Sequence, residues 1–343
     1  MHARSLVAAA AILALSYGPA AARDLTLVAR AQAQDATRQV FVQPFTAATA
    51  IAAQTESWDG GIDALRTEAK TPDNAWDLVM VDSDELATGC AEGLFEKLDW
   101  SSIGGKDHYL PQAVSDCGVG AGVASMVLVW DRDKFPAVPG WAEFWDVAKY
   151  PGKRGLHGGV RGTLEFALFA DGVSPADVYK VLATSEGVDR AFRRLDQLKP
   201  YIVWWNDEAE AARILTSGDV LMTSAPAAAI VMANRTSHRN IGVQWAASLY
   251  EVQSWVILKG SPNLRAATQY LYFAGTPAIE ARLVGLFGEG GLAKGANDGL
   301  PAELAPLSPT APANLSAAVR VDAGFWHDNL AKLRPRFETW LAH

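Results

Sequence analysis

Trp76-Asp77-Leu78-Val79-Met80-Val81-Asp82-Ser83-Asp84 is the segment that decides the fold. Its four consecutive apolar residues predict a buried strand, and the polar residues behind them are typical of the start of a helix. The same order occurs earlier, where an apolar strand at residues 25–28 precedes a helical pattern at residues 36–45 and a second strand at residues 50–55. Strands that alternate with helices predict an α/β fold with a parallel sheet, in which ligands bind beyond the carboxyl ends of the strands.

Polar and aromatic residues follow three of these predicted strands. Arg30 follows the first, Trp58 the second, and Asp82 with Ser83 the third. Because carboxyl ends of parallel strands meet at one edge of a sheet, we expect these residues near one another in a ligand crevice. Simpler interpretations stand beside this one. A tryptophan packs in a core more often than it stacks on a ligand, and Arg30 can form a surface ion pair with Asp35 or Asp82.

Composition limits the classes of function. The 343 residues include 30 Lys and Arg against 38 Asp and Glu, a net charge of −8. A chain of this length forms one large or two mid-sized domains and needs no metal or disulfide to build its core. The negative balance offers no overall positive field to phosphate backbones, so we expect no nucleic-acid partner.

The first 22 residues are typical of a secretory signal. A short positive start at residues 1–4 precedes an apolar run at residues 6–15 and three alanines at residues 20–22, and we expect cleavage after Ala22. The alternative is a cytosolic protein with an alanine-rich first helix. No later segment reaches the roughly 20 apolar residues that a membrane helix needs, so we expect a secreted mature protein without a membrane span.

The composition changes near residue 130. A connection rich in proline and tryptophan and a glycine-rich segment at residues 153–162 lead into a second α/β segment, and a strand-like run at residues 251–257 returns from it. We therefore expect one lobe from residues 23–130 and 256–343, which includes the C-terminal helices, and a second lobe from residues 131–255.

The search for catalytic and metal-binding motifs is negative. The sequence holds no HExxH, CxxC, Gly-x-Ser-x-Gly or Walker-type motif, so we expect no enzyme, cofactor or metal. Asp82, Asp84 and Glu85 could bind a hard cation, but carboxylates at a helix start more often cap it. Cys90 and Cys117 are either a disulfide of an oxidising compartment or two free thiols.

A longer set of motifs, in this order along nearly the whole mature chain, resembles the periplasmic solute-binding proteins of ABC importers, in the branch that captures spermidine, putrescine and 4-aminobutyrate. The motifs are Ser57-Trp58-Asp59-Gly60-Gly61, Ala75-Trp76-Asp77-Leu78-Val79, Gly89-Cys90-Ala91-Glu92-Gly93-Leu94, Asp116-Cys117-Gly118-Val119-Gly120, Trp141-Ala142-Glu143-Phe144-Trp145-Asp146, Tyr150-Pro151-Gly152-Lys153-Arg154-Gly155, Ser254-Trp255-Val256-Ile257 and Phe325-Trp326-His327-Asp328-Asn329.

The resemblance implies a type II binding-protein fold. This fold has two lobes, each a mostly parallel sheet flanked by helices, joined by two hinge crossings and closing on a small ligand without catalysis. It also implies that Cys90 pairs with Cys117 and that the partner is an ABC permease at the inner membrane. We expect the protein itself to be a monomer.

The ligand scheme that the resemblance implies is altered in this sequence. In the family, aromatic side chains stack on the methylene chain of the amine, and carboxylates accept its ammonium hydrogens. Here Arg30 and Ala124 stand where aromatic residues are expected, and Gln253 stands where a carboxylate is expected. The stretch at residues 223–229, which includes Ser224, resembles one where relatives carry Tyr, Asn and Arg.

These exchanges change the charge expected in the cleft. Arg30 adds positive charge and Gln253 removes negative charge, which favours a carboxylate-bearing or zwitterionic ligand over a dication. Arg161 could bind the carboxylate from the second lobe, and Glu251 could receive an amine. The expected ligand contacts are Arg30, Trp58, Asp82, Ser83, Arg161, Trp205, Ser224, Glu251 and Gln253.

Three alternatives remain open from the sequence. The first is a polyamine ligand, as in the relatives. The second is a secreted enzyme on the same fold, which needs an acid–base pair with perturbed pKa values in the cleft. The third is metal capture around residues 82–85.

Overall fold

The computed structural model describes residues 23–71, 74–237 and 239–343, so the predicted signal at residues 1–22 lies outside the described part. The strands of this part form one nine-stranded sheet in the order β2-β1-β3-β8-β4-β7-β5-β6, with β9 beside β8. The strands are β1 Leu25–Arg30, β2 Ala53–Trp58, β3 Leu78–Val81, β4 Gly118–Asp131, β5 Arg154–His157, β6 Ile202–Trp205, β7 Met222–Pro226, β8 Ile241–Ile257 and β9 Val319–Arg320.

The sheet is mixed, which corrects the expectation of mostly parallel lobes. The outer strands are parallel as predicted, with β1 between β2 and β3 in one half and β5 between β6 and β7 in the other. The central pairs β3–β8, β4–β8 and β4–β7 are antiparallel. Alternation of strands and helices therefore predicts the outer pairs, whereas the centre is built by strands that cross the molecule.

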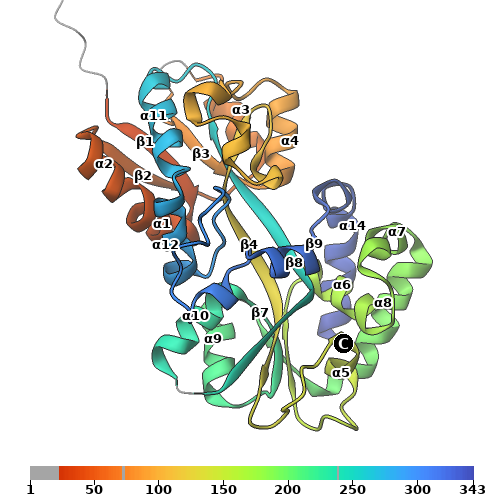
Figure 1. The fold of residues 1–343 in the computed structure, drawn as a ribbon. Coiled ribbons are helices and arrows are strands. Elements are labelled where there is room, and N and C mark those ends of the chain that lie inside the picture. Colours follow the sequence, from red (N-terminus) through yellow and green to blue (C-terminus); the bar gives the residue numbers. More distant parts are fainter. Residues whose placement is uncertain (1–22, 72–73, 238) are drawn as a thin grey trace, which may run out of the picture.

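Strands β4 and β8 connect the two halves of the molecule (Figure 1). They have 14 and 17 residues, and their antiparallel pairing is interrupted by two register shifts. Within these two strands, the sequence indicated only residues 251–257 as strand-like. The remaining parts of β4 and β8 have no recognisable strand pattern, because β4 begins with glycines and the first part of β8 contains polar residues. A strand that spans the space between two cores lacks one continuous apolar face.

Helices pack around each half and divide the core in two (Figure 1). The upper half in Figure 1 holds α1 Gln34–Ala36, α2 Gln43–Thr49, α3 Ile62–Glu68, α4 Ser83–Ala91, α11 Leu264–Ala274 and α12 Pro277–Phe287. The lower half holds α5 Trp141–Trp145, α6 Val160–Ala170, α7 Val178–Leu182, α8 Ser185–Leu198, α9 Glu208–Ser217 and α10 Ala227–Thr236. None of the described helices is long and apolar enough to span a membrane.

The C-terminal helix α14 (Ala323–Ala342) packs on the lower half, whereas the sequence placed residues 256–343 with the first lobe. Phe325, Trp326, Leu333 and Phe337 are buried in the same core as α6 and α8. The chain therefore passes between the halves a third time, through residues 305–322, with α13 (Pro312–Ala317) and β9 against β8. The helical pattern predicts the element, but complementarity to a distant core decides where it docks.

A disulfide and a buried carboxylate hold the upper half together. Cys90 at the end of α4 is bonded to Cys117 just before β4, with 5.7 Å between their Cα atoms, which confirms the pairing implied by the resemblance.

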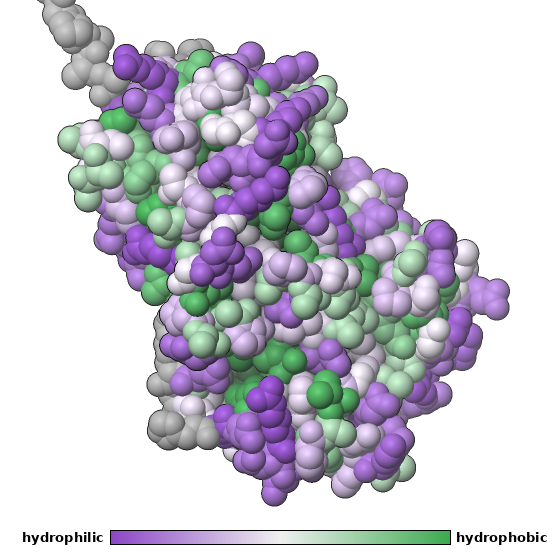
Figure 2. Space-filling model, viewed as in Figure 1, coloured by the Kyte–Doolittle hydropathy of each residue, from purple (hydrophilic) through white to green (hydrophobic). Residues whose placement is uncertain are grey.

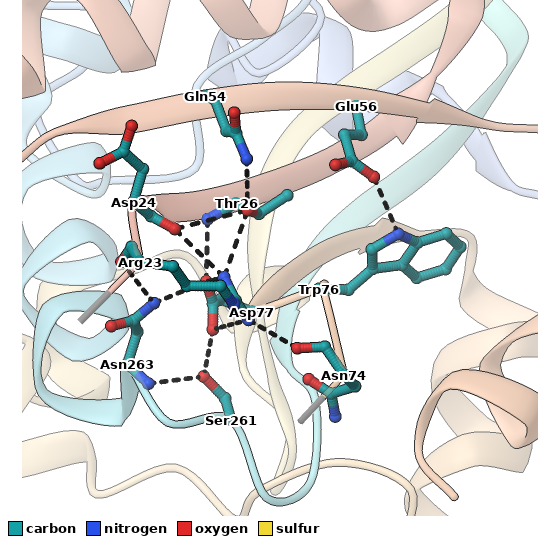
Figure 3. Close-up of polar contacts among 10 residues, drawn as sticks. All are labelled: Arg23, Asp24, Thr26, Gln54, Glu56, Asn74, Trp76, Asp77, Ser261 and Asn263. Atoms are coloured by element: carbon teal, nitrogen blue, oxygen red, sulfur yellow. Dashed lines mark hydrogen bonds and ion pairs between the residues drawn. The ribbon is translucent and has the colours of Figure 1, made fainter. Parts of the chain in front are cut away.

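Asp77, directly before β3, is fully buried and accepts hydrogen bonds from segments far apart in the sequence (Figure 3). Both nitrogens of the Arg23 guanidinium fork, the Thr26 backbone N–H, the Ser261 hydroxyl and the Asn263 amide all donate to it, at 2.5–3.1 Å. The carboxylate thus ties the first described residues to the start of α11.

Candidate ligand-binding site

A cavity of about 220 Å³ lies where the crossing strands meet the lower half. It faces the carboxyl ends of β5 and β7 and the start of α6, the place that parallel pairing predicts for a ligand crevice. Most of its wall is apolar, which suits a methylene chain. The lining residues are Ala124, Ser125, Met126, His157, Arg161, Gly162, Pro226, Leu249, Tyr250, Glu251 and Val321.

Arg161 enters the cavity because the first turn of α6 is broken. Arg161 has extended backbone angles (φ −66°, ψ 137°), and Gly162 has a positive φ of 80° that a side chain would strain. Regular helix begins only after them, where the Glu165 carboxylate accepts the Gly162 N–H at 2.9 Å. The Arg161 guanidinium lies 5.8 Å from the centre of the Trp326 ring, and its buried Nε has no hydrogen-bond partner among the described residues.

Glu251 faces Arg161 from β8. The closest atoms, Nη1 and Oε1, are 3.9 Å apart, which is an ion pair without a hydrogen bond. Desolvation raises the pKa of Glu251, Asp82 and Asp84 raise it further, and Arg161 opposes them. The Glu251 side chain is 42% accessible, and it lines the same cavity as Arg161. One cation and one carboxylate are therefore presented to the same space.

Two further polar groups line the cavity. Ser125 is 7% exposed, and its hydroxyl oxygen has no hydrogen-bond partner among the described residues. A buried hydroxyl without a partner is costly, so a ligand or water that supplies one is favoured. Burial lowers the pKa of His157, which keeps its ring neutral at pH 7, and this ring lies 4.8 Å from that of Trp205. Sequence reasoning had assigned neither Ser125 nor His157 to the site.

Arg30 does not line the cavity. Its Nη2 lies 2.9 Å from both the Asp82 and the Glu85 carboxylates, and its Nη1 donates to the Asp59 carbonyl oxygen at 2.7 Å. The guanidinium also lies 5.1 Å from the centre of the Trp58 ring. The pairing with Asp82 that the sequence offered as the simpler interpretation is present, and both terminal nitrogens of Arg30 donate within the upper half.

Asp82 and Ser83 lie at the border of the two halves. Asp82 is the residue before α4, and the Ser83 hydroxyl donates to the Val252 carbonyl oxygen at 3.1 Å, which ties α4 to β8. Together with Asp84 they line a small cavity that also includes Arg161 and Glu251. The predicted residues Asp82, Ser83, Arg161 and Glu251 are thus brought together.

The other predicted contacts lie away from the cavity wall. Trp58 and Trp205 are 6% and 2% exposed and pack in cores, and Ser224 is fully buried in β7. Gln253 is half-buried two residues along β8 from Glu251, outside the lining. Val321 lines the cavity only because the chain crosses a third time, and no sequence pattern signals it. No group of three or more His, Cys, Asp and Glu residues in the described ranges could hold a metal.

The comparison with protein families decides the identity of the fold. Residues 41–311 match the family model described as bacterial extracellular solute-binding protein. The chain belongs to this solute-binding protein family. The gamma-aminobutyric acid-binding protein of Pseudomonas aeruginosa is 38% identical to this solute-binding protein over 336 residues, which are 96% of this chain and 95% of the relative. The resemblance drawn from the motifs is confirmed.

Solved structures agree with the family assignment. An ABC transporter substrate-binding protein from Bradyrhizobium japonicum has a TM-score of 0.77 at 28% identity, covering 92% of this chain and 99% of its own. A structure described as a GABA receptor has a TM-score of 0.80 at 26% identity, covering 93% and 98%. The fold is therefore the α/β fold of type II periplasmic binding proteins. This solute-binding protein is the capturing component of an ABC importer, and its family consists of binding proteins, not enzymes.

Proposed function

We propose that this protein captures 4-aminobutyrate, or an ω-amino acid of similar length, between two lobes and delivers it to an ABC permease at the inner membrane. The observation that carries this proposal is the presence of Arg161 and Glu251, of opposite charge, on the wall of one largely apolar cavity. The 38% identity to a gamma-aminobutyric acid-binding protein supports the same ligand class.

The cavity matches the three parts of such a ligand. A guanidinium binds a carboxylate through two parallel N–H donors, and Arg161 still has an unpartnered Nε. The apolar wall suits the methylene groups. Glu251, together with Asp82 and Asp84, makes one side of the site acidic. The negative charge on this side attracts the ammonium group of the ligand.

We assign each segment to a lobe by the apolar core that it joins. The first lobe contains residues 23–130 and the part of residues 256–343 that precedes the third crossing, and the second contains residues 131–255 with α14. Closure of the lobes would bend β4, β8 and residues 305–322.

We also propose export through the signal at residues 1–22, with cleavage after Ala22, and a monomeric state. Figure 2 shows that hydrophilic and hydrophobic side chains are mixed over the described residues on this face of the molecule.

Isothermal titration of residues 23–343 with 4-aminobutyrate, butyrate, butylamine and putrescine tests the ligand. We expect 4-aminobutyrate to bind tightest, because it alone satisfies both charges. Tight binding of putrescine without binding of 4-aminobutyrate would overturn the proposal, since the site would then accept a dication beside Arg161.

A further inference from the structure

A second carboxylate, Glu289, is placed between the halves by the chain that follows α12. Gly288 ends α12 in the left-handed conformation (φ 66°), and a Cβ at this position would collide with the backbone of Ala227 and Ala228 at the start of α10. Gly290 then exchanges two 2.9 Å hydrogen bonds with Val123 of β4. These two contacts leave little freedom for the residue between them, Glu289.

The Val123–Gly290 bridge sets the neighbours of Glu289. In an antiparallel bridge the flanking residues also face each other, so Glu289 lies beside Ala124, which lines the cavity. On the other side of Ala124, β8 places Glu251 in register with it. The carboxylate leans over Gly122, since Oε2 is 3.0 Å from the position that a Cβ on this glycine would take. A larger residue at position 122 would displace it.

Among the residues that the structure describes, no cationic side chain is recorded in contact with Glu289. Glu208, the first residue of α9, acts on it by repulsion, while α10 begins with alanines and β4 contributes Gly122 and Ala124. None of the ion pairs formed by the described residues involves Glu289 or Glu208. Burial, with repulsion from Glu208 added, raises the pKa of Glu289 to about 7. A half-buried carboxylate in such surroundings gains from a cation that arrives with a ligand.

We propose that Glu289 is the residue that receives the ammonium group of the ligand, so that the ligand lies across Ala124 with its carboxylate on Arg161 and its amine on Glu289. This inference rests on the proposed function and adds a specificity-determining residue to it. Glu251, 3.9 Å from Arg161, contributes to the negative potential of the same side of the site, whereas Glu289 takes part in none of the ion pairs of the described residues. The unpartnered, buried Ser125 hydroxyl at the next position on β4 independently marks this part of the cavity as built for a polar ligand group.

The arrangement also explains a ligand of intermediate length. Neighbouring strands lie about 4.8 Å apart, so Glu251 and Glu289 are roughly 10 Å apart at the backbone, with Ala124 between them. Because both residues are in register with Ala124, their side chains lie on the same face of the sheet. The small Ala124 side chain leaves room for the methylene groups over it.

Titration of 4-aminobutyrate and butyrate into the wild type, Glu289→Gln and Glu208→Gln tests this role. Glutamine keeps the size of the side chain and removes its charge. We expect the wild type to prefer 4-aminobutyrate over butyrate by at least about 30-fold, as expected for a desolvated charge pair. Glu289→Gln should lose most of this preference and keep butyrate affinity. Glu208→Gln is the control for loss of a nearby charge and should keep the preference.

Proton release gives a second readout. With its pKa raised to about 7, Glu289 is partly protonated at neutral pH, and an ammonium partner would expel the proton. The binding enthalpy of the wild type should therefore depend on the ionisation enthalpy of the buffer, and that of Glu289→Gln should depend on it less.

The outcomes separate the two proposals. A folded Glu289→Gln variant, checked by its melting temperature, that keeps the wild-type preference and the wild-type proton release would overturn the role of Glu289 and leave the proposed function standing. A wild type that does not bind 4-aminobutyrate would overturn the proposed function itself.

Discussion

Arg161 of α6 and Glu251 of β8 face each other across the cavity with 3.9 Å between Nη1 and Oε1. The two side chains are 35% and 42% exposed, so the pair contributes at most about 1 kcal/mol to stability. Its distance is too long for a hydrogen bond, which leaves guanidinium donors free for a ligand carboxylate. A zwitterion can interact favourably with both Arg161 and Glu251. A dication would be repelled by Arg161, and a dianion would be repelled by Glu251.

Arg161→Ala is expected to weaken 4-aminobutyrate binding by at least about 30-fold, because it removes the charged donor of a desolvated pair. Arg161→Lys should recover part of the loss, since it keeps the charge but not the two-pronged donor geometry. Isothermal titration measures both affinities. Unchanged affinity in Arg161→Ala would show that the carboxylate binds elsewhere.

Arg30→Ala is the matched control, because this arginine is part of a network in the upper half. We expect it to leave ligand affinity within about threefold and to lower the free energy of unfolding by about 1–3 kcal/mol, since Glu85 is 6% exposed and would lose its cation. Denaturant unfolding and titration on the same sample measure the two effects. A large loss of affinity without loss of stability would contradict this assignment.

Removal of the Cys90–Cys117 disulfide tests how firmly α4 is held. The bridge closes a loop with a sequence separation of 27 residues, and its loss through a double Cys→Ser exchange should cost about 3 kcal/mol of unfolding free energy. A reducing agent should produce the same shift in the wild type and none in the double variant. Equal melting temperatures of oxidised and reduced wild type would refute the prediction.

Asp77→Ala should be among the most destabilising exchanges in the upper half. Five described donors point at this carboxylate, so its removal deprives the Thr26 N–H and the Ser261 hydroxyl of a buried acceptor and the Arg23 guanidinium of its anion, and it should cost about 3–5 kcal/mol. Asp77→Asn, which keeps one acceptor oxygen, should lose less. Urea unfolding compares the two variants, and equal losses would show that the charge and not the acceptor geometry matters.

Glu165 links stability to pH. It is fully buried and accepts hydrogen bonds from Trp326 Nε1, the Tyr179 hydroxyl and the Gly162 N–H, yet desolvation raises its pKa to about 7 from 4.5. A carboxyl with a raised pKa stabilises the fold fully below its ordinary pKa, and this contribution is lost as pH rises toward 7.

Between pH 5 and pH 8, Glu165 should therefore lower the free energy of unfolding by on the order of 2–3 kcal/mol. Glu165→Gln should reduce this pH dependence. Glu280, whose pKa burial raises to about 8, changes stability in the same direction in both proteins, so the difference between their pH profiles isolates Glu165. Parallel profiles would contradict the prediction.

Local patterns predicted much of the fold and part of the site. The apolar run before Asp82 and the helical pattern after it determine β3 and α4, since periodicity and capping are properties of neighbouring residues. Arg161 and Glu251 were found because an isolated charge in a glycine-rich or strand-like segment is visible in the sequence. The pairing of Arg30 with Asp82 and Glu85 was not decided by the sequence, because a strand end does not reveal which carboxylates will reach it.

The sequence by itself determined the α/β class, the family and the chemical types of the candidate binding residues, because strands, helices and motifs are encoded over short distances. Only the tertiary structure decided that α14 joins the lower half, that Val321 reaches the cavity and that Glu289 lies beside Ala124. These placements depend on complementary packing and on backbone pairing between residues more than 100 positions apart. Such long-range contacts leave no local periodicity to read.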